Sequence, residues 1–160
     1  MQRIVISIAR QTLTTYEGGQ VLSTFAVSTA AKGAGELKGS YQTPRGLHYI
    51  RAKIGEGAPE NAVFVGRRFT GEIYNAELAA QFPQRDWILT RILWLCGRET
   101  GRNRLGAVDT MARYIYIHGT PDSESVGIAK SHGCIRMHNQ ALLRLFTWVK
   151  PGCPVLIEEN

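Results

Sequence analysis

The chain opens with short segments in which apolar and polar positions alternate. Residues 3–9 are rich in β-branched side chains and place alternate residues on opposite faces, a period of two that is typical of strands. Residues 13–16 and 21–29 follow the same pattern, and Glu17–Gln20 lies between them as a hairpin-like turn. The first thirty residues therefore predict a meander of antiparallel strands.

The middle of the chain is less regular. Residues 31–46 contain five glycines or prolines and predict a loop, whereas residues 47–54 return to strand-like composition. Residues 63–65 predict a short strand and residues 75–81 a helical turn. Residues 87–96 are almost wholly apolar, and periodicity does not separate a buried strand from a buried helix there.

The last third contains the clearest helix. Residues 114–117 alternate β-forming side chains and predict a strand, and Asn139 is expected to be the N-cap of the helix that follows. Apolar residues of this helix recur at the spacing i, i+3, i+4 and i+7, namely Leu142, Leu145, Phe146 and Val149. Residues 151–152 end the helix and residues 155–157 form a last strand. The pattern predicts a single domain over residues 1–160, mainly β (a β-rich α+β fold) with one well-marked helix.

Composition is consistent with this fold. The chain has 160 residues, of which 44% are hydrophobic and 20% charged, which is ordinary for a globular domain. No apolar run approaches the roughly 20 residues that a membrane-spanning helix needs. The first ten residues lack the basic, apolar and small-residue regions of a signal peptide. The sequence therefore predicts a cytoplasmic protein, or a periplasmic one if an export signal has been removed.

The formal net charge is +6. Such a charge fits nucleic acid, an anionic surface or an acidic small substrate. The arginines are scattered, however, and Arg67–Arg68 is the only adjacent basic pair. No basic run is interleaved with aromatic residues, so a basic surface is favoured over nucleic-acid binding.

The three cysteines differ in their surroundings. Cys96 lies among apolar residues and Cys153 in a Pro-Gly-Cys-Pro turn, whereas Cys134 has polar neighbours. An odd count without a Cys-x-x-Cys spacing argues against a disulfide framework and a zinc ribbon. Unpaired cysteines suit a reducing compartment.

Cys134 is the best candidate for a nucleophile. It follows Gly133 directly, and His118 lies sixteen residues upstream at the end of an apolar run. We expect His118 to take the thiol proton, leaving a thiolate–imidazolium pair. The N–H groups of Gly133 and Cys134 would then form an oxyanion hole.

Two further features could face a substrate. Arg136, two residues beyond the cysteine, could bind a carboxylate through both guanidinium nitrogens, although a surface or structural ion pair is the commoner role of arginine. Residues 97–106 form a polar loop with three arginines that could act as a lid.

A metal site is the alternative chemistry. Histidine and cysteine ligands for zinc could come from four residues: His118, His132, Cys134 and His138. Neither paired cysteines nor a His-x-x-x-His motif accompanies them, so neither a metal nor another cofactor is predicted. His48 and His138 are assigned no role.

At this point the residues match a family. His118-Gly119-Thr120 together with Ser131-His132-Gly133-Cys134-Ile135-Arg136-Met137 closely resembles the signature of the L,D-transpeptidase (YkuD) family. Residues 43–46 resemble its Thr-Pro-x-Gly turn, and residues 152–157 its closing Gly-x-x-Val strand. The resemblance covers essentially the whole chain.

The resemblance implies a YkuD-like mixed β-sandwich with one helix packed near the catalytic loop. It also implies that Cys134 attacks the third residue, a diamino acid, of a peptidoglycan stem tetrapeptide, so that D-alanine leaves and a thioester forms. His118 would be the general base, with its other nitrogen held by a backbone carbonyl such as that of Gly119. Gly133 would supply an N–H group to the oxyanion. Ser131, His132 and Arg136 would contact the substrate or hold the loop. Carbapenems would acylate the cysteine.

The group that accepts the acyl chain from Cys134 decides which reaction the protein would catalyse. An amine would give 3–3 crosslinks or D-amino-acid exchange, and water would give an L,D-carboxypeptidase. Most exported relatives carry a signal sequence or a wall-binding module, neither of which this sequence shows. We therefore expect hydrolysis of free muropeptides, tetrapeptide to tripeptide, during cytoplasmic recycling. An inactive wall-peptide-binding module is the alternative of another class. The expected partners are stem peptides or muropeptides, with no nucleic acid and no membrane span, and the oligomeric state is not predicted.

Overall fold

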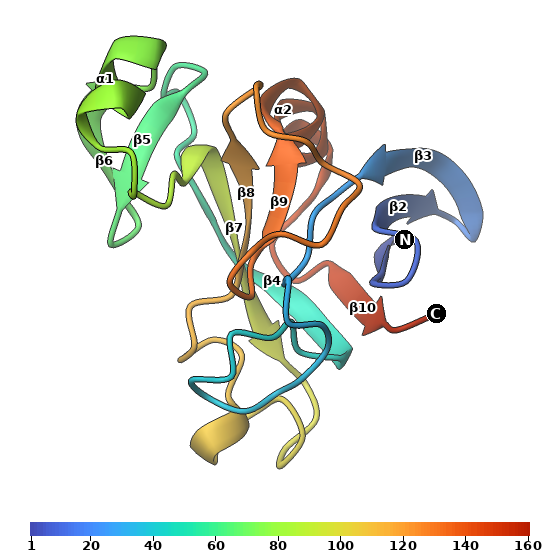
Figure 1. Cartoon of the computed structure of the whole chain (residues 1–160). Helices are drawn as coiled ribbons and strands as arrows, with labels where there is room; N and C mark the ends of the chain where they lie inside the picture. Colours follow the sequence, from blue (N-terminus) through green and yellow to red (C-terminus); the bar gives the residue numbers. More distant parts are fainter.

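Ten strands hydrogen-bond into one curled mixed sheet in the computed structural model, which describes residues 1–160 (Figure 1). The strands are β1 (Gln2–Ser7), β2 (Thr12–Glu17), β3 (Gln20–Ala26), β4 (Gly46–Ile54), β5 (Ala62–Val65), β6 (Arg68–Ile73), β7 (Leu89–Gly97), β8 (Tyr116–Thr120), β9 (Ile135–His138) and β10 (Pro154–Glu158). The helices are α1 (Ala76–Gln81) and α2 (Asn139–Trp148), with a short 3-10 turn η1 (Gly106–Val108). The mainly β fold class is confirmed.

The sheet joins the two ends of the chain. β10 lies between β1, with which it is parallel, and β4, with which it is antiparallel. β4 then pairs with the long strand β7. β7 also pairs with β8 and, at its first residue, with β5, so it connects the N-terminal meander to the rest of the sheet.

The parallel pair β8–β9 positions the predicted catalytic residues. Its register sets His118 opposite Arg136 and Ile117 opposite Ile135. All five residues of β8 are buried, as expected for a parallel pair covered on both faces. The loop before β9, which contains Cys134, is therefore brought beside the start of β8.

Most of the predicted elements are confirmed. The meander, the strands at 47–54 and 63–65 and the closing strand all form, and residues 87–96 prove to be the strand β7 rather than a helix. Two strands were missed. β6 has five exposed residues out of six and therefore no buried apolar face, and β9 is only four residues long.

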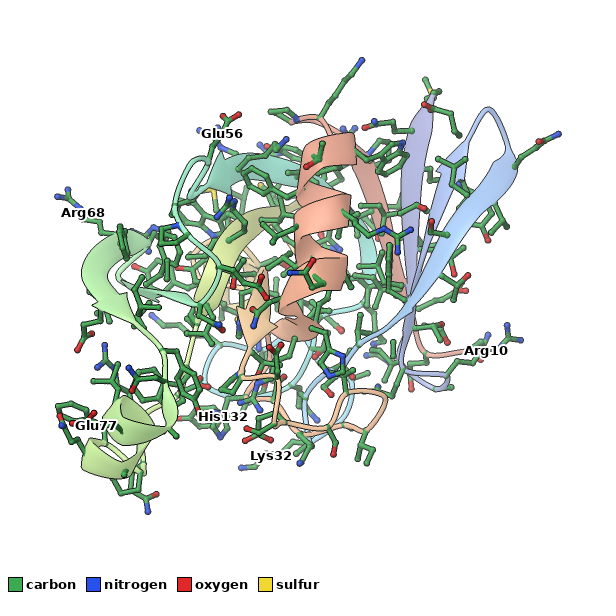
Figure 2. All side chains as sticks on the ribbon, turned by 90° about the horizontal axis from the view of Figure 1, so that it is seen from above. Arg10, Lys32, Glu56, Arg68, Glu77 and His132 are labelled. Carbon is green, nitrogen blue, oxygen red and sulfur yellow. The ribbon has the colours of Figure 1, made fainter.

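Helix α2 covers the sheet beside the β8–β9 pair, as the resemblance implied. Seen from above, it lies between the N-terminal strands and the β5–β6 hairpin (Figure 2). Its buried side chains Leu142, Leu145 and Phe146 join Ile117, Ile135 and other apolar residues in one large core cluster. Neither helix of the chain is long and apolar enough to cross a membrane.

Asn139 does not cap this helix, contrary to the expectation. The N-cap is His138, without a side-chain cap bond, and Asn139 is the first helical residue. Its side chain is fully buried. The carboxamide accepts a hydrogen bond from the Thr90 hydroxyl (2.6 Å), and its –NH₂ group donates to three oxygens, those of Thr120 O, Asn61 Oδ1 and Asp122 Oδ1. Asn139 therefore connects β7, β8 and the start of α2 through hydrogen bonds.

We predict that Asn139→Ala lowers the free energy of unfolding by about 2–4 kcal/mol, because several buried polar partners lose their hydrogen bonds at once. Asn75→Ala is the matched control. Asn75 is the exposed N-cap of α1 and makes a single side-chain bond, to Leu78 N–H (2.7 Å), so its loss should cost about 1 kcal/mol. Urea unfolding followed by tryptophan fluorescence measures both changes. Equal losses would contradict the structural role given to Asn139.

Candidate active site

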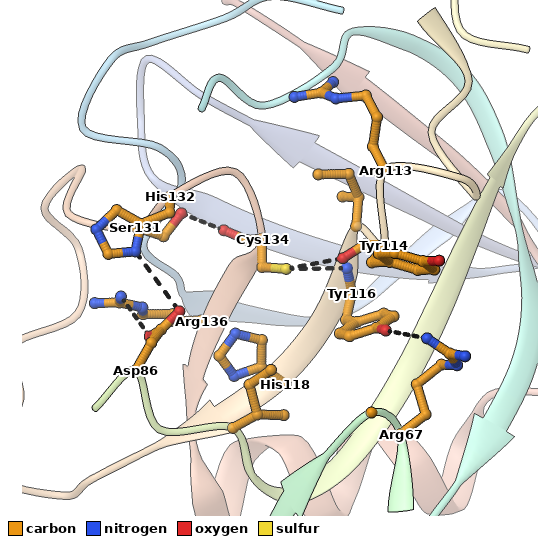
Figure 3. Close-up of a pocket in the computed structure, with 13 residues that line it drawn as sticks. Arg67, Asp86, Arg113, Tyr114, Tyr116, His118, Ser131, His132, Cys134 and Arg136 are labelled. Carbon is orange, nitrogen blue, oxygen red and sulfur yellow. Dashed lines mark hydrogen bonds and ion pairs between the residues drawn. The ribbon is translucent and has the colours of Figure 1, made fainter. Parts of the chain in front are cut away.

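Cys134 and His118 line the same cavity, which has a volume of about 500 Å³. Its walls come from four segments: the β5–β6 turn, the stretch before β7, the entrance to β8 and the loop before β9. Figure 3 shows the thiol in the middle, with Asp86 and Arg136 on one side and Arg67 and Tyr116 on the other. The lining residues that concern the chemistry are Arg67, Asp86, Arg113, Tyr114, Tyr116, His118, Ser131, His132, Cys134 and Arg136.

The sulfur of Cys134 is held by backbone groups at the entrance to β8. It accepts a hydrogen bond from the N–H of Tyr116 (3.3 Å) and donates its proton to the carbonyl oxygen of Tyr114 (3.4 Å). The side chain is only partly buried. The thiol therefore has a fixed direction while a face of it remains open to the cavity.

The imidazole of His118 is fully oriented by its own strand. The ring is buried, and Nδ1 lies 2.7 Å from the carbonyl oxygen of Gly119, as expected. A carbonyl oxygen only accepts, so Nδ1 carries the proton and Nε2 keeps the lone pair. The ring lies next to the cysteine in Figure 3, although no hydrogen bond joins the two. Such bonds are often long before a substrate binds.

The packing around Gly119 leaves no room for a side chain. A Cβ there would lie 2.2 Å from Asn139 Oδ1 and 2.5 Å from the carbonyl oxygen of Leu89. Any side chain would therefore push β8 away from β7 and from the buried Asn139. The carbonyl group that orients His118 would move with it.

The surroundings of the two groups disfavour the expected thiolate–imidazolium pair. Burial raises the pKa of the Cys134 thiol to about 12, against the opposing effects of Tyr116 N–H and of the Arg136 and Arg113 charges. Burial also lowers the pKa of His118. Both shifts favour the uncharged forms because loss of contact with water penalises a charged group. Both shifts act against a thiolate–imidazolium pair before substrate binds.

The loop 131–134 is held by its own polar groups. The Ser131 hydroxyl donates to the carbonyl oxygen of Cys134 and accepts from the N–H of Gly133 (3.2 Å). Gly133 N–H is therefore already engaged, which corrects its assignment to the oxyanion hole. The N–H of Cys134 has no partner in the chain and is the remaining candidate. Ser131 lines the cavity but is buried, and both hydrogen bonds of its hydroxyl hold the loop.

The Thr-Pro-x-Gly turn contacts the same loop. The buried hydroxyl of Thr43 donates to the carbonyl oxygen of Gly133 (2.9 Å) and accepts from Ala30 N–H (3.0 Å). Gly133 itself has a φ of 131°, a conformation that side chains disfavour. A motif ninety residues upstream thus holds the cysteine loop in place.

Arg136 is not free to clamp a carboxylate. Its guanidinium is mostly buried and pairs with Asp86 (3.1 Å). Asp86 also lies 3.6 Å from Nδ1 of His132, whose ring is mostly exposed at the cavity mouth. His132 therefore lies where a substrate could touch it, whereas Arg136 acts through its aspartate partner.

Three charged lining residues are not predicted from the sequence. Asp86 precedes the apolar run of β7, and no motif marks it. Arg113 donates to carbonyl oxygens of the 35–42 loop, including that of Gln42 (2.7 Å). Arg67 reaches the cavity from the β5–β6 turn. Only its place in the single adjacent basic pair distinguished Arg67 in the sequence.

Several predicted features lie elsewhere. The 97–106 loop does not line this cavity, so the lid prediction is wrong. It packs instead on residues 45–47, where Glu99 accepts from Leu47 N–H (2.8 Å) and Asn103 donates to two carbonyl oxygens. His48 is buried against Thr110 (2.9 Å), away from the cysteine. The four proposed zinc ligands are not brought together into a possible metal-binding group.

The geometry and the fold agree with a known family. Residues 1–157 match the YkuD family model, described as the L,D-transpeptidase catalytic domain. The chain therefore belongs to the L,D-transpeptidase (YkuD) family.

Individual relatives are similar over part of their length. YqjB of Bacillus subtilis, assigned as an L,D-transpeptidase, is 46% identical over 54 residues, or 34% of this chain and 31% of YqjB. The Enterococcus faecium L,D-transpeptidase, solved as a cysteine-to-serine mutant, superposes with a TM-score of 0.59 at 19% identity, covering 98% of this chain and 49% of that one. LdtMt1, solved in complex with imipenem, superposes with a TM-score of 0.55 at 21% identity, covering 98% of this chain and 58% of LdtMt1. This chain thus spans less than two thirds of each of these relatives.

We predict that Cys134 contributes no thiolate at neutral pH in the free protein, because burial keeps the thiol protonated. The ultraviolet thiolate absorbance of the wild type and of Cys134→Ala should then be equal at neutral pH. A difference should appear only under strongly alkaline conditions. A one-thiolate difference at neutral pH would contradict this prediction.

Proposed function

We propose that the protein catalyses acyl transfer from the L,D peptide bond of a peptidoglycan stem peptide, with Cys134 as nucleophile and His118 as general base. The observation that carries this proposal is the juxtaposition of the two residues in one cavity. Cys134 has a directed thiol, and His118 has its free Nε2 defined by the Gly119 carbonyl.

In the first half-reaction the Cys134 sulfur attacks the carbonyl carbon of the third stem residue. Nε2 of His118 takes the thiol proton as the S–C bond forms, so no free thiolate is needed beforehand. The unpartnered N–H of Cys134 donates to the developing oxyanion. When the C–N bond breaks, His118 returns the proton to the leaving amine. D-alanine departs and a thioester remains.

The charge of the cavity supports an acidic peptide as substrate. Three arginines line it, namely Arg67, Arg113 and Arg136, and Asp86 is the only acidic residue among the lining side chains. An excess of positive charge in a concave site concentrates anions. Stem peptides carry free carboxylates, so their charge is complementary to the site.

We further propose that carbapenems acylate Cys134. The family relative LdtMt1 was solved in complex with imipenem. A β-lactam carbonyl presents the same electrophile to a cysteine as a peptide carbonyl does. Acylation by imipenem would therefore occupy the site without requiring a stem peptide.

For the second half-reaction we propose water as the main acceptor, which makes the protein an L,D-carboxypeptidase acting on free muropeptides in the cytoplasm. The three free cysteines support this proposal, because unpaired thiols suit a reducing compartment. The rival acceptor is the amine of a second stem, which would give a crosslink and which the name of the family favours.

We predict that a purified disaccharide tetrapeptide is converted to tripeptide and free D-alanine. Cys134→Ala should abolish D-alanine release, and His118→Gln should reduce its rate at least about 100-fold because the general base is lost. His138→Gln is the matched control, since the ring of this exposed histidine makes a single hydrogen bond, with the carbonyl oxygen of Glu124 (3.3 Å). Mass spectrometry of the products measures all four proteins.

Other products would change the assignment. Crosslinked dimers or exchanged D-amino acids as the main products would refute hydrolysis and make the protein a transpeptidase. No turnover by the wild type, with tetrapeptide still bound, would support the binding-module alternative. Equal losses in His118→Gln and His138→Gln would remove His118 from its role as base.

A further inference from the structure

Arg67 presents an unused, pre-oriented guanidinium to the catalytic cavity. It is the one lining arginine without a carboxylate or carbonyl partner: Arg136 pairs with Asp86, and Arg113 donates to the 35–42 loop. The only hydrogen bond of Arg67 goes to the hydroxyl of Tyr116 (3.1 Å). Most of its five N–H donors therefore remain available.

Two aromatic rings fix the position of this guanidinium. Its central carbon lies 4.5 Å from the ring centre of Trp94 and 5.0 Å from that of Tyr114. Cation–π contacts of this kind hold the planar group at a defined place with little loss of flexibility on binding. Figure 3 shows Arg67 beyond Tyr116, on the side of the thiol opposite Asp86 and Arg136.

The backbone that carries Arg67 is also unusual. Gly66 and Arg67 are the two central residues of the β5–β6 hairpin, and both have a positive φ, of 56° and 65°. Glycine and asparagine are the usual residues at such positions. A long side chain at this site bears a backbone cost, and here it folds back over Trp94 into the cavity.

We propose that Arg67 is a specificity-determining residue that binds a carboxylate of the stem peptide in bidentate fashion. The inference rests on the proposed function and adds the group by which this site selects its substrate. Two carboxylates have the required chemistry in a tetrapeptide whose third residue is a diamino dicarboxylic acid: the terminal α-carboxylate of D-alanine and the side-chain carboxylate of that third residue. Planar guanidinium and carboxylate groups match through two parallel hydrogen bonds.

Direct binding to a Cys134→Ala background tests the proposal without turnover. Isothermal titration would measure the affinities of three probes: the tetrapeptide, its C-terminal amide, and the analogue amidated on the diamino-acid carboxylate. The tetrapeptide should bind roughly ten- to a hundredfold tighter than one of the two amides, because a charge-assisted bond is lost. The amide that loses affinity identifies the carboxylate.

Arg67→Gln in the same background should remove that discrimination, so that acid and amide bind alike. Arg68→Gln is the matched control. Arg68 is the adjacent exposed residue, points away from the protein in Figure 2 and does not line the cavity, yet its loss changes the net charge equally. Arg67→Lys should recover part of the discrimination, because lysine keeps the charge but not the planar pair of donors.

Three results would overturn the proposal: unchanged discrimination in Arg67→Gln, an equal effect of Arg68→Gln, or no preference of the parent protein for the acid. A separate measurement, D-alanine release by the wild type, tests the proposed function. Turnover without any dependence on Arg67 would refute only the specificity role. Arg67-dependent binding without turnover would refute only the proposed catalysis.

Discussion

The parallel pairing of β8 with β9 is the constraint on which the candidate site depends. Its register places His118 beside Arg136 and brings the loop before β9 to the entrance of β8. There the N–H of Tyr116 reaches the sulfur of Cys134. Because side chains alternate between faces along a strand, a slip of one residue would turn His118 away from the thiol. The two proposed reacting groups, sixteen residues apart in sequence, are therefore aligned by backbone hydrogen bonds.

Contacts from neighbouring elements stabilise the β8–β9 register. Asn139 hydrogen-bonds β7 and β8 from the start of α2, and Gly119 leaves the space that this close contact needs. Thr43 holds the cysteine loop from the other side through Gly133. These contacts are made by short polar or side-chain-free residues, so the family signature largely records how the loop is held. Only Cys134 and His118 within it are placed to react.

The sequence was sufficient to predict several elements of the fold and the two central site residues, but not the other charged residues of the cavity. Alternation along residues 3–29 and the apolar spacing of 142–149 identify strands and a helix because each reflects one buried face. The cysteine and histidine stand out by their neighbours. By contrast, Asp86 and Arg67 reach the cavity from loops distant in the chain, and no local pattern marks them. The raised pKa of the Cys134 thiol was also not predictable, because desolvation depends on packing that only the folded chain supplies.

The central claim is that Cys134 forms a thioester with a stem-peptide acyl group. Acid-quenched intact-protein mass spectrometry after mixing with tetrapeptide tests it most directly. The account predicts an adduct with the mass of the tripeptide acyl group, which hydroxylamine removes and which Cys134→Ala never forms. Tetrapeptide turnover without any adduct on Cys134, or an adduct that persists in Cys134→Ala, would contradict the account.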